Sequence, residues 1–137
     1  MKVFFDTSAF AKRYVEERGT NRVIEICSRA DAVGLSVICL PEMVSALCRL
    51  VREKKVRQQE CESMREIILA DLEDADICDI TSSVLTHALR CLENNALRAL
   101  DAIQLGCALA YAPDLFVSSD RRQIKAARSE GLTVIEV

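Results

Sequence analysis

The 137-residue sequence contains no tryptophan, few aromatic residues and a single histidine. Its core must therefore be built from aliphatic side chains and cysteine, and the 50% hydrophobic content suits one domain over residues 1–137. His87 has no serine or cysteine partner in a recognisable motif, so the sequence does not indicate nucleophilic catalysis. No apolar run is long enough to span a membrane. The apolar segment after Met1 and Lys2 is too short for a signal peptide, so we expect no membrane association and a cytoplasmic location.

Clustered metal-binding cysteines and a strong net charge are also missing. The seven cysteines are odd in number and include no CxxC pair, which indicates reduced core residues rather than a disulfide framework or a zinc site. The formal net charge of −3 argues mildly against broad, non-specific binding of nucleic acid, because such binding depends on many phosphate contacts. A local basic patch remains compatible with this charge.

Short apolar runs alternate with segments of helical spacing along the whole chain. Strands are expected at 2–5, 32–38, 75–80, 115–118 and 133–137. Helices are expected at 8–17, 20–30, from Pro41 to the charged segment near 52–57, at 58–74, 82–94, 96–112 and 120–129. Strands that are apolar on both faces and alternate with helices predict an α/β fold, a parallel sheet sandwiched between helices.

Four acidic residues stand out against this pattern. Asp6 and Asp120 each directly follow a predicted strand, and Glu42 lies in the first turn of the helix after another strand. The carboxyl ends of parallel strands share one edge of the sheet, where ligands bind in open α/β folds. Asp101 lies in an otherwise apolar helical stretch, where a carboxylate is costly unless it is paired, hydrogen-bonded or bound to a metal.

Each acid also has a purely structural explanation. Asp6 and Asp120 could cap helices, and Glu42 could interact with a helix dipole. Asp101 could pair with Arg98, three residues earlier on the same helix. Together, however, four carboxylates at one edge repel each other unless a cation lies between them, and the junctions offer no obvious lysine or arginine. Mg²⁺ or Mn²⁺ is the natural partner of such oxygen ligands, so the pattern indicates metal-assisted phosphodiester hydrolysis.

Four segments of the sequence resemble segments of a known family. They occur in the same order as in that family, and together they extend from one end of the chain to the other. They are FFDTSAFAKRYVEE, LPEMVSALCRL, LRALDAIQLGCAL and FVSSDRRQIKAARSEGLTVIEV. The chain resembles PIN-domain proteins, and most of all the VapC-type toxin ribonucleases of bacterial or archaeal toxin–antitoxin pairs. The resemblance implies a PIN-like α/β/α sandwich and an endoribonuclease that uses one or two Mg²⁺ or Mn²⁺ ions to activate water. It also implies a homodimer and a cognate antitoxin that covers the site.

The resemblance also assigns roles to particular residues. The acids that match the family's catalytic and metal-binding set are Asp6, Glu42, Asp101 and Asp120. Ser118 lies where the family often has a hydroxyl near the site, and Thr7 and Ser8 match the polar residues expected to orient the first acid.

Basic residues near two of the acids have two explanations. Lys12 and Arg13 follow Asp6 by one or two helical turns, and both could hold the RNA backbone. Arg121 and Arg122 directly follow the last acid of the set and could do the same. The alternative for both pairs is solvated helix surface. The Met-containing helices between 43 and 72 could likewise serve a dimer or antitoxin contact, or simply the core.

Two other functions also place acids at strand ends. A non-catalytic module of the same fold would bind RNA or protein and keep the acids only as structural remnants. A receiver-type phosphoacceptor would need a neighbouring pair of acids before the phosphorylated aspartate and a lysine at a later strand end. The chain has neither feature in place, so the nuclease and the non-catalytic module remain the two hypotheses.

Overall fold

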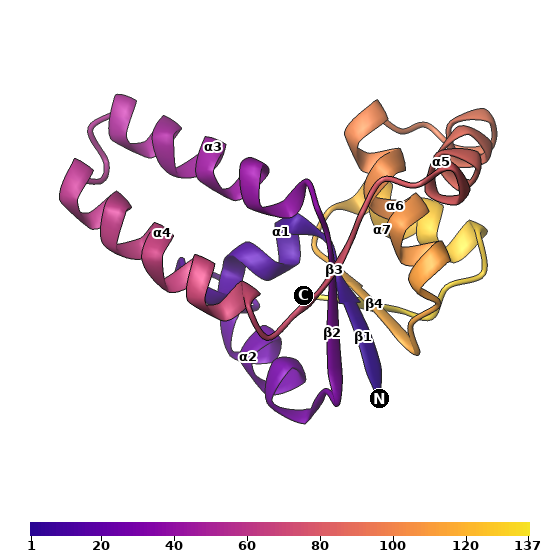
Figure 1. Ribbon diagram of the computed structural model, residues 1–137, viewed down its shortest axis with the longest axis horizontal. Helices are drawn as coiled ribbons and strands as arrows, with labels where there is room; N and C mark the ends of the chain where they lie inside the picture. The colour runs from indigo at the N-terminus through magenta and orange to yellow at the C-terminus, as the bar shows by residue number, and fades with distance from the viewer.

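The computed structural model describes residues 1–137 as a five-stranded parallel sheet with helices on both faces (Figure 1). The strands are β1 (Lys2–Phe5), β2 (Ala32–Ser36), β3 (Asp76–Cys78), β4 (Leu115–Ser118) and β5 (Val134–Glu136). They lie in the order β3-β2-β1-β4-β5, and every neighbouring pair is parallel. β1 is central, so its carboxyl end lies between those of β2 and β4. The predicted element order and α/β fold are confirmed.

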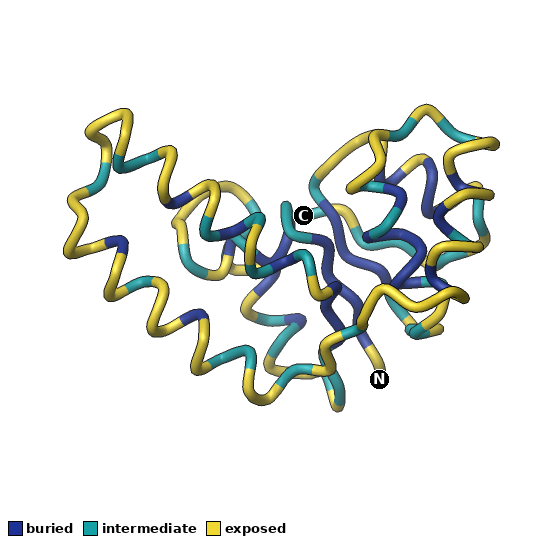
Figure 2. The backbone as a smooth tube through the Cα atoms, turned by 45° about the horizontal axis from the view of Figure 1, so that its top comes forward, coloured by how far each residue is buried: buried dark blue, intermediate teal, exposed yellow.

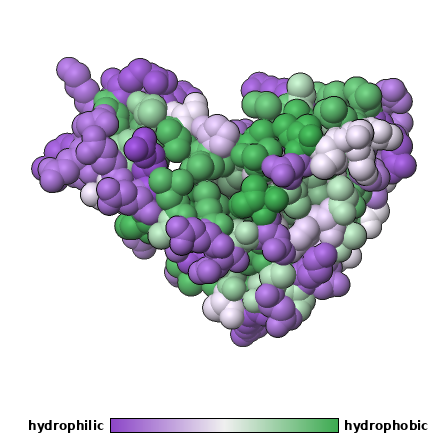
Figure 3. Space-filling view, in the orientation of Figure 1, coloured by the Kyte–Doolittle hydropathy of each residue, from purple (hydrophilic) through white to green (hydrophobic).

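The helices form one layer on each face of the sheet (Figure 1). The first layer holds α1 (Thr7–Phe10), the 3₁₀ turn η1 (Ala11–Arg13), α2 (Thr20–Arg29), α3 (Cys39–Arg52) and α4 (Gln58–Leu72). The second holds α5 (Ser82–Asn94), α6 (Ala99–Tyr111) and α7 (Arg121–Ser129). Figure 3 shows the two layers as lobes with a notch between them. None of these helices combines the length and the apolar character needed to cross a membrane.

The central strand explains why the sheet needs cover on both sides. Successive side chains of a strand point to opposite faces. Val3 and Phe5 are buried against the layer of α1 to α4, whereas Phe4 is buried against α5 to α7. Figure 2 shows buried backbone along the strands, while the outer parts of α3 and α4 are mostly exposed. The apolar sequence of β1 therefore fills two separate cores.

Three helix boundaries differ from the sequence expectation. The helix expected at 8–17 is only a single turn, α1, followed by η1. Tyr14 ends this segment by packing against Phe10 and donating its hydroxyl to Asp71 of α4, a tertiary contact that local spacing does not reveal. The helix expected to begin at Pro41 already begins at Cys39. Proline is tolerated there because backbone N–H groups in the first turn have no intrahelical partner. The helix expected at 96–112 begins three residues later, as α6.

All seven cysteines are free thiols. The buried ones are Cys39, Cys61, Cys91 and Cys107. Cys48 is exposed on α3 and does not belong to the core, because the outer half of that helix extends beyond the sheet.

Candidate active site

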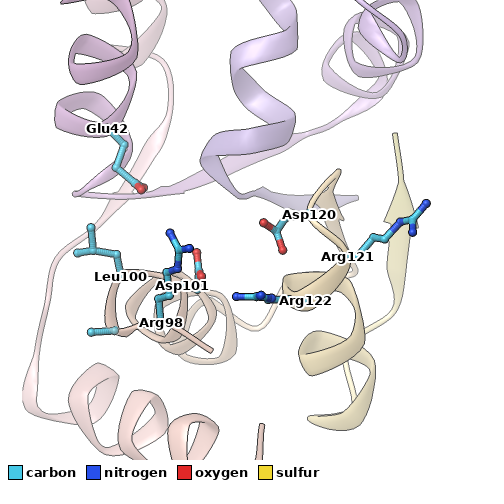
Figure 4. A pocket seen from close by; sticks show the side chains of 8 residues that line it. Glu42, Arg98, Leu100, Asp101, Asp120, Arg121 and Arg122 are labelled. Atoms are coloured by element: carbon cyan, nitrogen blue, oxygen red, sulfur yellow. The ribbon is translucent and has the colours of Figure 1, made fainter. Parts of the chain in front are cut away.

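A pocket of about 590 Å³ lies where the two helix layers meet the carboxyl edge of the sheet. Its lining residues are Glu42, Arg98, Ala99, Leu100, Asp101, Asp120, Arg121 and Arg122. Figure 4 shows the carboxylates of Glu42, Asp101 and Asp120 directed toward one space from α3, α6 and the start of α7. Three of the four predicted acids therefore share one pocket, although they are far apart in the sequence.

Asp6, the fourth acid, does not line this pocket and is only 3% exposed. Its Oδ1 accepts hydrogen bonds from the Ser8 hydroxyl at 2.7 Å and from the backbone N–H of Ala9 at 2.9 Å, which caps α1. Its Oδ2 accepts a bond from the hydroxyl of Ser118. Burial, with a smaller contribution from the charge of Asp120, raises the pKa of Asp6 to about 6 against the lowering effect of these donors. Asp6 is both a helix cap and a neighbour of the acidic pocket.

Glu42 is held by two donors on different elements. Its Oε1 accepts a hydrogen bond from Thr7 Oγ1 at 2.7 Å and from Gln104 Nε2 at 2.8 Å. Thr7, which the sequence leads us to expect beside Asp6, therefore bonds to Glu42 instead. Gln104 is absent from the sequence prediction. The available signal was its position on α6, three residues after Asp101, as a polar residue in an otherwise apolar stretch.

Asp101 and Asp120 complete the acidic lining. Asp101 lies in the first turn of α6, and burial raises its pKa. The negative charges of Asp120 and Glu42 raise the pKa of Asp101 further, whereas a backbone hydrogen bond from Arg98 lowers it. Asp120 caps α7 by accepting the backbone N–H of Gln123 at 3.0 Å. Asp101 therefore lies within electrostatic reach of both Asp120 and Glu42.

Three arginines line the same pocket, which corrects the expectation that the strand–helix junctions lack basic residues. Figure 4 shows the guanidinium groups of Arg98 and Arg122 on the side of the acids, while Arg121 points away. The salt bridges of the chain all involve other residues. The arginines therefore border the acids without neutralising them in direct ion pairs. Arg98 was considered in the sequence only as a partner for Asp101.

Lys12 and Arg13, the other predicted basic pair, do not line the pocket. The Lys12 side chain is largely buried, and its ammonium group donates to the backbone oxygen of Arg18 at 2.7 Å. Arg13 pairs with Asp71 of α4 at 3.5 Å. Because the chain turns through η1 after α1, closeness to Asp6 in sequence does not bring these side chains to the acidic edge.

The chemistry of the acids fits a hard cation that keeps part of its water shell. All candidate ligands are carboxylate oxygens, which Mg²⁺ and Mn²⁺ prefer. No three His, Cys, Asp or Glu side chains are gathered closely enough to hold an ion on their own. Mg²⁺ usually retains several waters and needs only one or two protein carboxylates. One or two of Glu42, Asp101 and Asp120 would hold such an ion directly, and the remaining acids of the pocket would contact it through its waters.

Comparisons with known proteins identify the family of the chain. The PIN domain family model matches residues 3–129. The chain is 31% identical over 138 residues to Ribonuclease VapC45 of Mycobacterium tuberculosis (strain CDC 1551 / Oshkosh), covering 96% of this chain and 93% of that protein.

Two solved structures also share the fold. One is VapBC2 from Rickettsia felis bound to a DNA fragment from its promoter, with a TM-score of 0.72, 14% identity and coverage of 100% of this chain and 99% of that one. The other is a toxin–antitoxin complex from Klebsiella pneumoniae, with a TM-score of 0.69, 14% identity and coverage of 98% and 99%. At these identities the two structures show a common fold and nothing more.

Proposed function

This chain belongs to the PIN-domain family, and from that membership we propose that it is a metal-dependent endoribonuclease of the VapC type, the toxin of a toxin–antitoxin pair. The observation that carries the proposal is the convergence of Glu42, Asp101 and Asp120 on one pocket from three different elements. The relative with 31% identity is a ribonuclease, which supports RNA as the class of substrate.

The proposed reaction is hydrolysis of an RNA phosphodiester bond by water. A bound Mg²⁺ or Mn²⁺ ion would lower the pKa of a coordinated water and stabilise charge on the phosphate. Asp101 lies in the first turn of α6 and Asp120 caps α7, and the dipole at such helix starts attracts negative charge. Thr7 donates to Oε1 of Glu42 and keeps that carboxylate in place. Ser118 donates to Asp6 and stabilises its ionised form, which burial alone would disfavour.

The arginines of the pocket are the proposed contacts to the substrate. Arg98 and Arg122 face the acids, so they can bind the phosphate groups that flank the scissile bond. Arg121 lies at the rim and can contact a more distant phosphate. Concentrating basic residues at the pocket allows a chain with a net charge of −3 to bind RNA locally.

The proposed partners are a cognate antitoxin and a second copy of the chain. The antitoxin is supported by the shared fold with a protein from a toxin–antitoxin complex. The homodimer is supported by exposed apolar surface on α5, where Leu85 is 46% and Leu89 is 60% exposed and the two lie one turn apart. A cytoplasmic location is supported by the seven free thiols, which are typical of reducing compartments.

The decisive experiment is an RNA cleavage assay with the purified chain. We expect cleavage with Mn²⁺ or Mg²⁺, loss of cleavage with EDTA, and a decrease of about 100-fold or more in the Asp6→Asn and Asp101→Asn variants. Undiminished cleavage by both variants would contradict the assigned roles. RNA binding without cleavage and without Mn²⁺ binding would favour the non-catalytic module. Growth arrest on overexpression, relieved by a small neighbouring gene product, would test the toxin assignment.

A further inference from the structure

We propose that Gln104 is a positioning residue that directs the Glu42 carboxylate into the acidic pocket. This inference rests on the proposed function, because it gives Gln104 a role in a metal-dependent site. Gln104 does not line the pocket and would act only through Glu42.

Three hydrogen bonds join Gln104, Thr7 and Glu42 in a closed triangle. Gln104 Nε2 donates to Thr7 Oγ1 at 2.6 Å and to Glu42 Oε1 at 2.8 Å, and Thr7 Oγ1 donates to the same Oε1 at 2.7 Å. The carboxylate can only accept, so the amide must present its N–H₂ group rather than its oxygen. Both bonds fall on Oε1, which leaves Oε2 of Glu42 as the oxygen available to the pocket.

The position of Gln104 on α6 connects this triangle to the other acids. It follows Asp101 by three residues, so the two side chains lie on the same face of the helix. Glu42 comes from α3, which belongs to the helix layer on the opposite face of the sheet. The amide of Gln104 therefore links the helix of one pocket acid directly to the side chain of another. This link sets the separation of Glu42 from Asp101.

The buried environment of Gln104 pairs one half of its amide and leaves the other half unpaired. Its side chain is only 2% exposed, and its Oε1 is buried without a hydrogen-bond partner. A buried amide oxygen without a donor destabilises the folded state. Methionine has a similar length and shape and no oxygen to satisfy. A buried glutamine that orients a pocket acid, with an oxygen left unpaired, is what a functional constraint predicts at this position.

The test is the Gln104→Met variant, measured for Mn²⁺ binding by calorimetry and for thermal unfolding without metal. We expect Mn²⁺ affinity to fall by about tenfold, as is usual for residues that orient metal ligands, with an unchanged or higher melting temperature. In a Glu42→Gln background the same substitution should change affinity by less than about twofold, because a residue that acts through Glu42 has no further effect once that carboxylate is gone.

Two further variants make the result specific. Thr7→Val removes the other donor to Glu42 and should also weaken Mn²⁺ binding. Tyr111→Phe is the matched control. Tyr111 lies at the far end of α6, and the substitution removes its 2.8 Å hydrogen bond to Asp76 of β3. We expect the control to lower stability and leave Mn²⁺ affinity unchanged.

Three results would overturn the proposal: equal Mn²⁺ affinity in wild type and Gln104→Met, an additive effect in the Glu42→Gln background, or loss of affinity only together with a lower melting temperature. Each of these leaves the proposed nuclease function intact, provided that the wild type binds Mn²⁺ and cleaves RNA. A wild-type chain that does neither contradicts the proposed function itself, and the role of Gln104 with it.

Discussion

Ser118 donates a hydrogen bond to Oδ2 of Asp6, and the same hydroxyl accepts the backbone N–H of Asp120 at 3.0 Å. The register of the sheet produces this contact. β1 and β4 are parallel neighbours with Phe5 opposite Val117, so the residues that follow each strand also lie side by side. One hydroxyl thus connects two acids that are more than a hundred positions apart in the sequence.

The first prediction concerns the stability of the metal-free protein as a function of pH. Burial raises the pKa of Asp6 from 3.8 to about 6 in the folded state. Between these values the folded protein binds more protons than the unfolded chain, so the free energy of unfolding falls as pH rises. The contribution is fully present below pH 4 and is lost above about pH 6, and it amounts to about 3 kcal/mol.

Urea denaturation in EDTA from pH 4 to pH 7 measures this effect. The Asp6→Asn variant carries no ionisable group at this position, so its stability should depend less on pH in the same range. Parallel curves for the wild type and the variant would show that Asp6 is not the group responsible.

The second prediction is that Ser118→Ala destabilises the metal-free protein at pH 7 by about 1–3 kcal/mol, since a buried carboxylate loses a donor. At pH 4 the loss should be smaller, because a protonated Asp6 depends less on that donor. RNA cleavage should also decrease, as the link between Asp6 and Asp120 is broken. Ser28→Ala on α2, whose hydroxyl bonds only to a backbone oxygen on the exposed surface, is the control and should preserve cleavage. An equal loss at both pH values would count against a bond to ionised Asp6.

The third prediction concerns neutralisation of a pocket acid. Burial raises the pKa of Asp101, and the charges of Asp120 and Glu42 raise it further, so Asp101→Asn should make the metal-free protein more stable by removing a partly buried charge and this repulsion. Saturating Mn²⁺ at 100 times its Kd should stabilise the wild type by about 2.7 kcal/mol and the variant much less. Melting curves without Mn²⁺ test the higher stability of the variant, and melting curves with Mn²⁺ test its smaller stabilisation by the metal. An equal metal response in the two proteins would exclude Asp101 as a ligand.

The fourth prediction separates RNA binding from catalysis. Arg122→Ala should raise KM for RNA with little change in kcat, because the arginine binds phosphate and holds no metal. A plot of log affinity for single-stranded RNA against log salt concentration should also become less steep. Its slope should change by about 0.7 for each phosphate that the variant no longer neutralises. Arg29→Ala, which removes a surface pair with Glu25 on α2, should change neither quantity. An unchanged salt slope in Arg122→Ala would show that Arg122 does not bind the RNA backbone.

The sequence was sufficient to predict where the four acids lie in the fold, because their positions follow from local rules. Asp6 and Asp120 follow buried strands, and the edge that parallel strands share brings them together wherever the helices lie. Asp101 was identifiable because a carboxylate in an apolar helix needs a compensating partner. These inferences use only hydrophobic periodicity and the alternation of strands and helices along the chain, and the structure confirms that alternation and the parallel sheet.

The remaining residues depend on tertiary contacts that periodicity does not encode. Gln104 and Thr7 meet Glu42 only because α1, α3 and α6 converge at the end of β1 and β2. The sequence left Lys12 either near the RNA backbone or on solvated helix surface, yet the side chain is largely buried and its ammonium group donates to the backbone oxygen of Arg18. Side-chain direction after a single helical turn was therefore the weakest part of the prediction.

The last prediction tests the close packing that places α6 beside α5. A Cβ atom at Gly106 would lie 2.6 Å from the backbone oxygen of Val84, and backbone cannot move aside as a flexible side chain can. Alanine is favoured over glycine inside a helix by about 1 kcal/mol, but overpacking in a core costs about 1–3 kcal/mol. We therefore expect Gly106→Ala to lower the free energy of unfolding in urea.

Thr86→Ala is the control for this substitution. It lies on the exposed face of α5 and brings a gain in helix propensity without a clash, so it should leave the free energy of unfolding equal or higher. If Gly106→Ala were as stable as that control, the two helices would have room to separate, and the position of Asp101 on α6 would be less firmly fixed than the structure indicates.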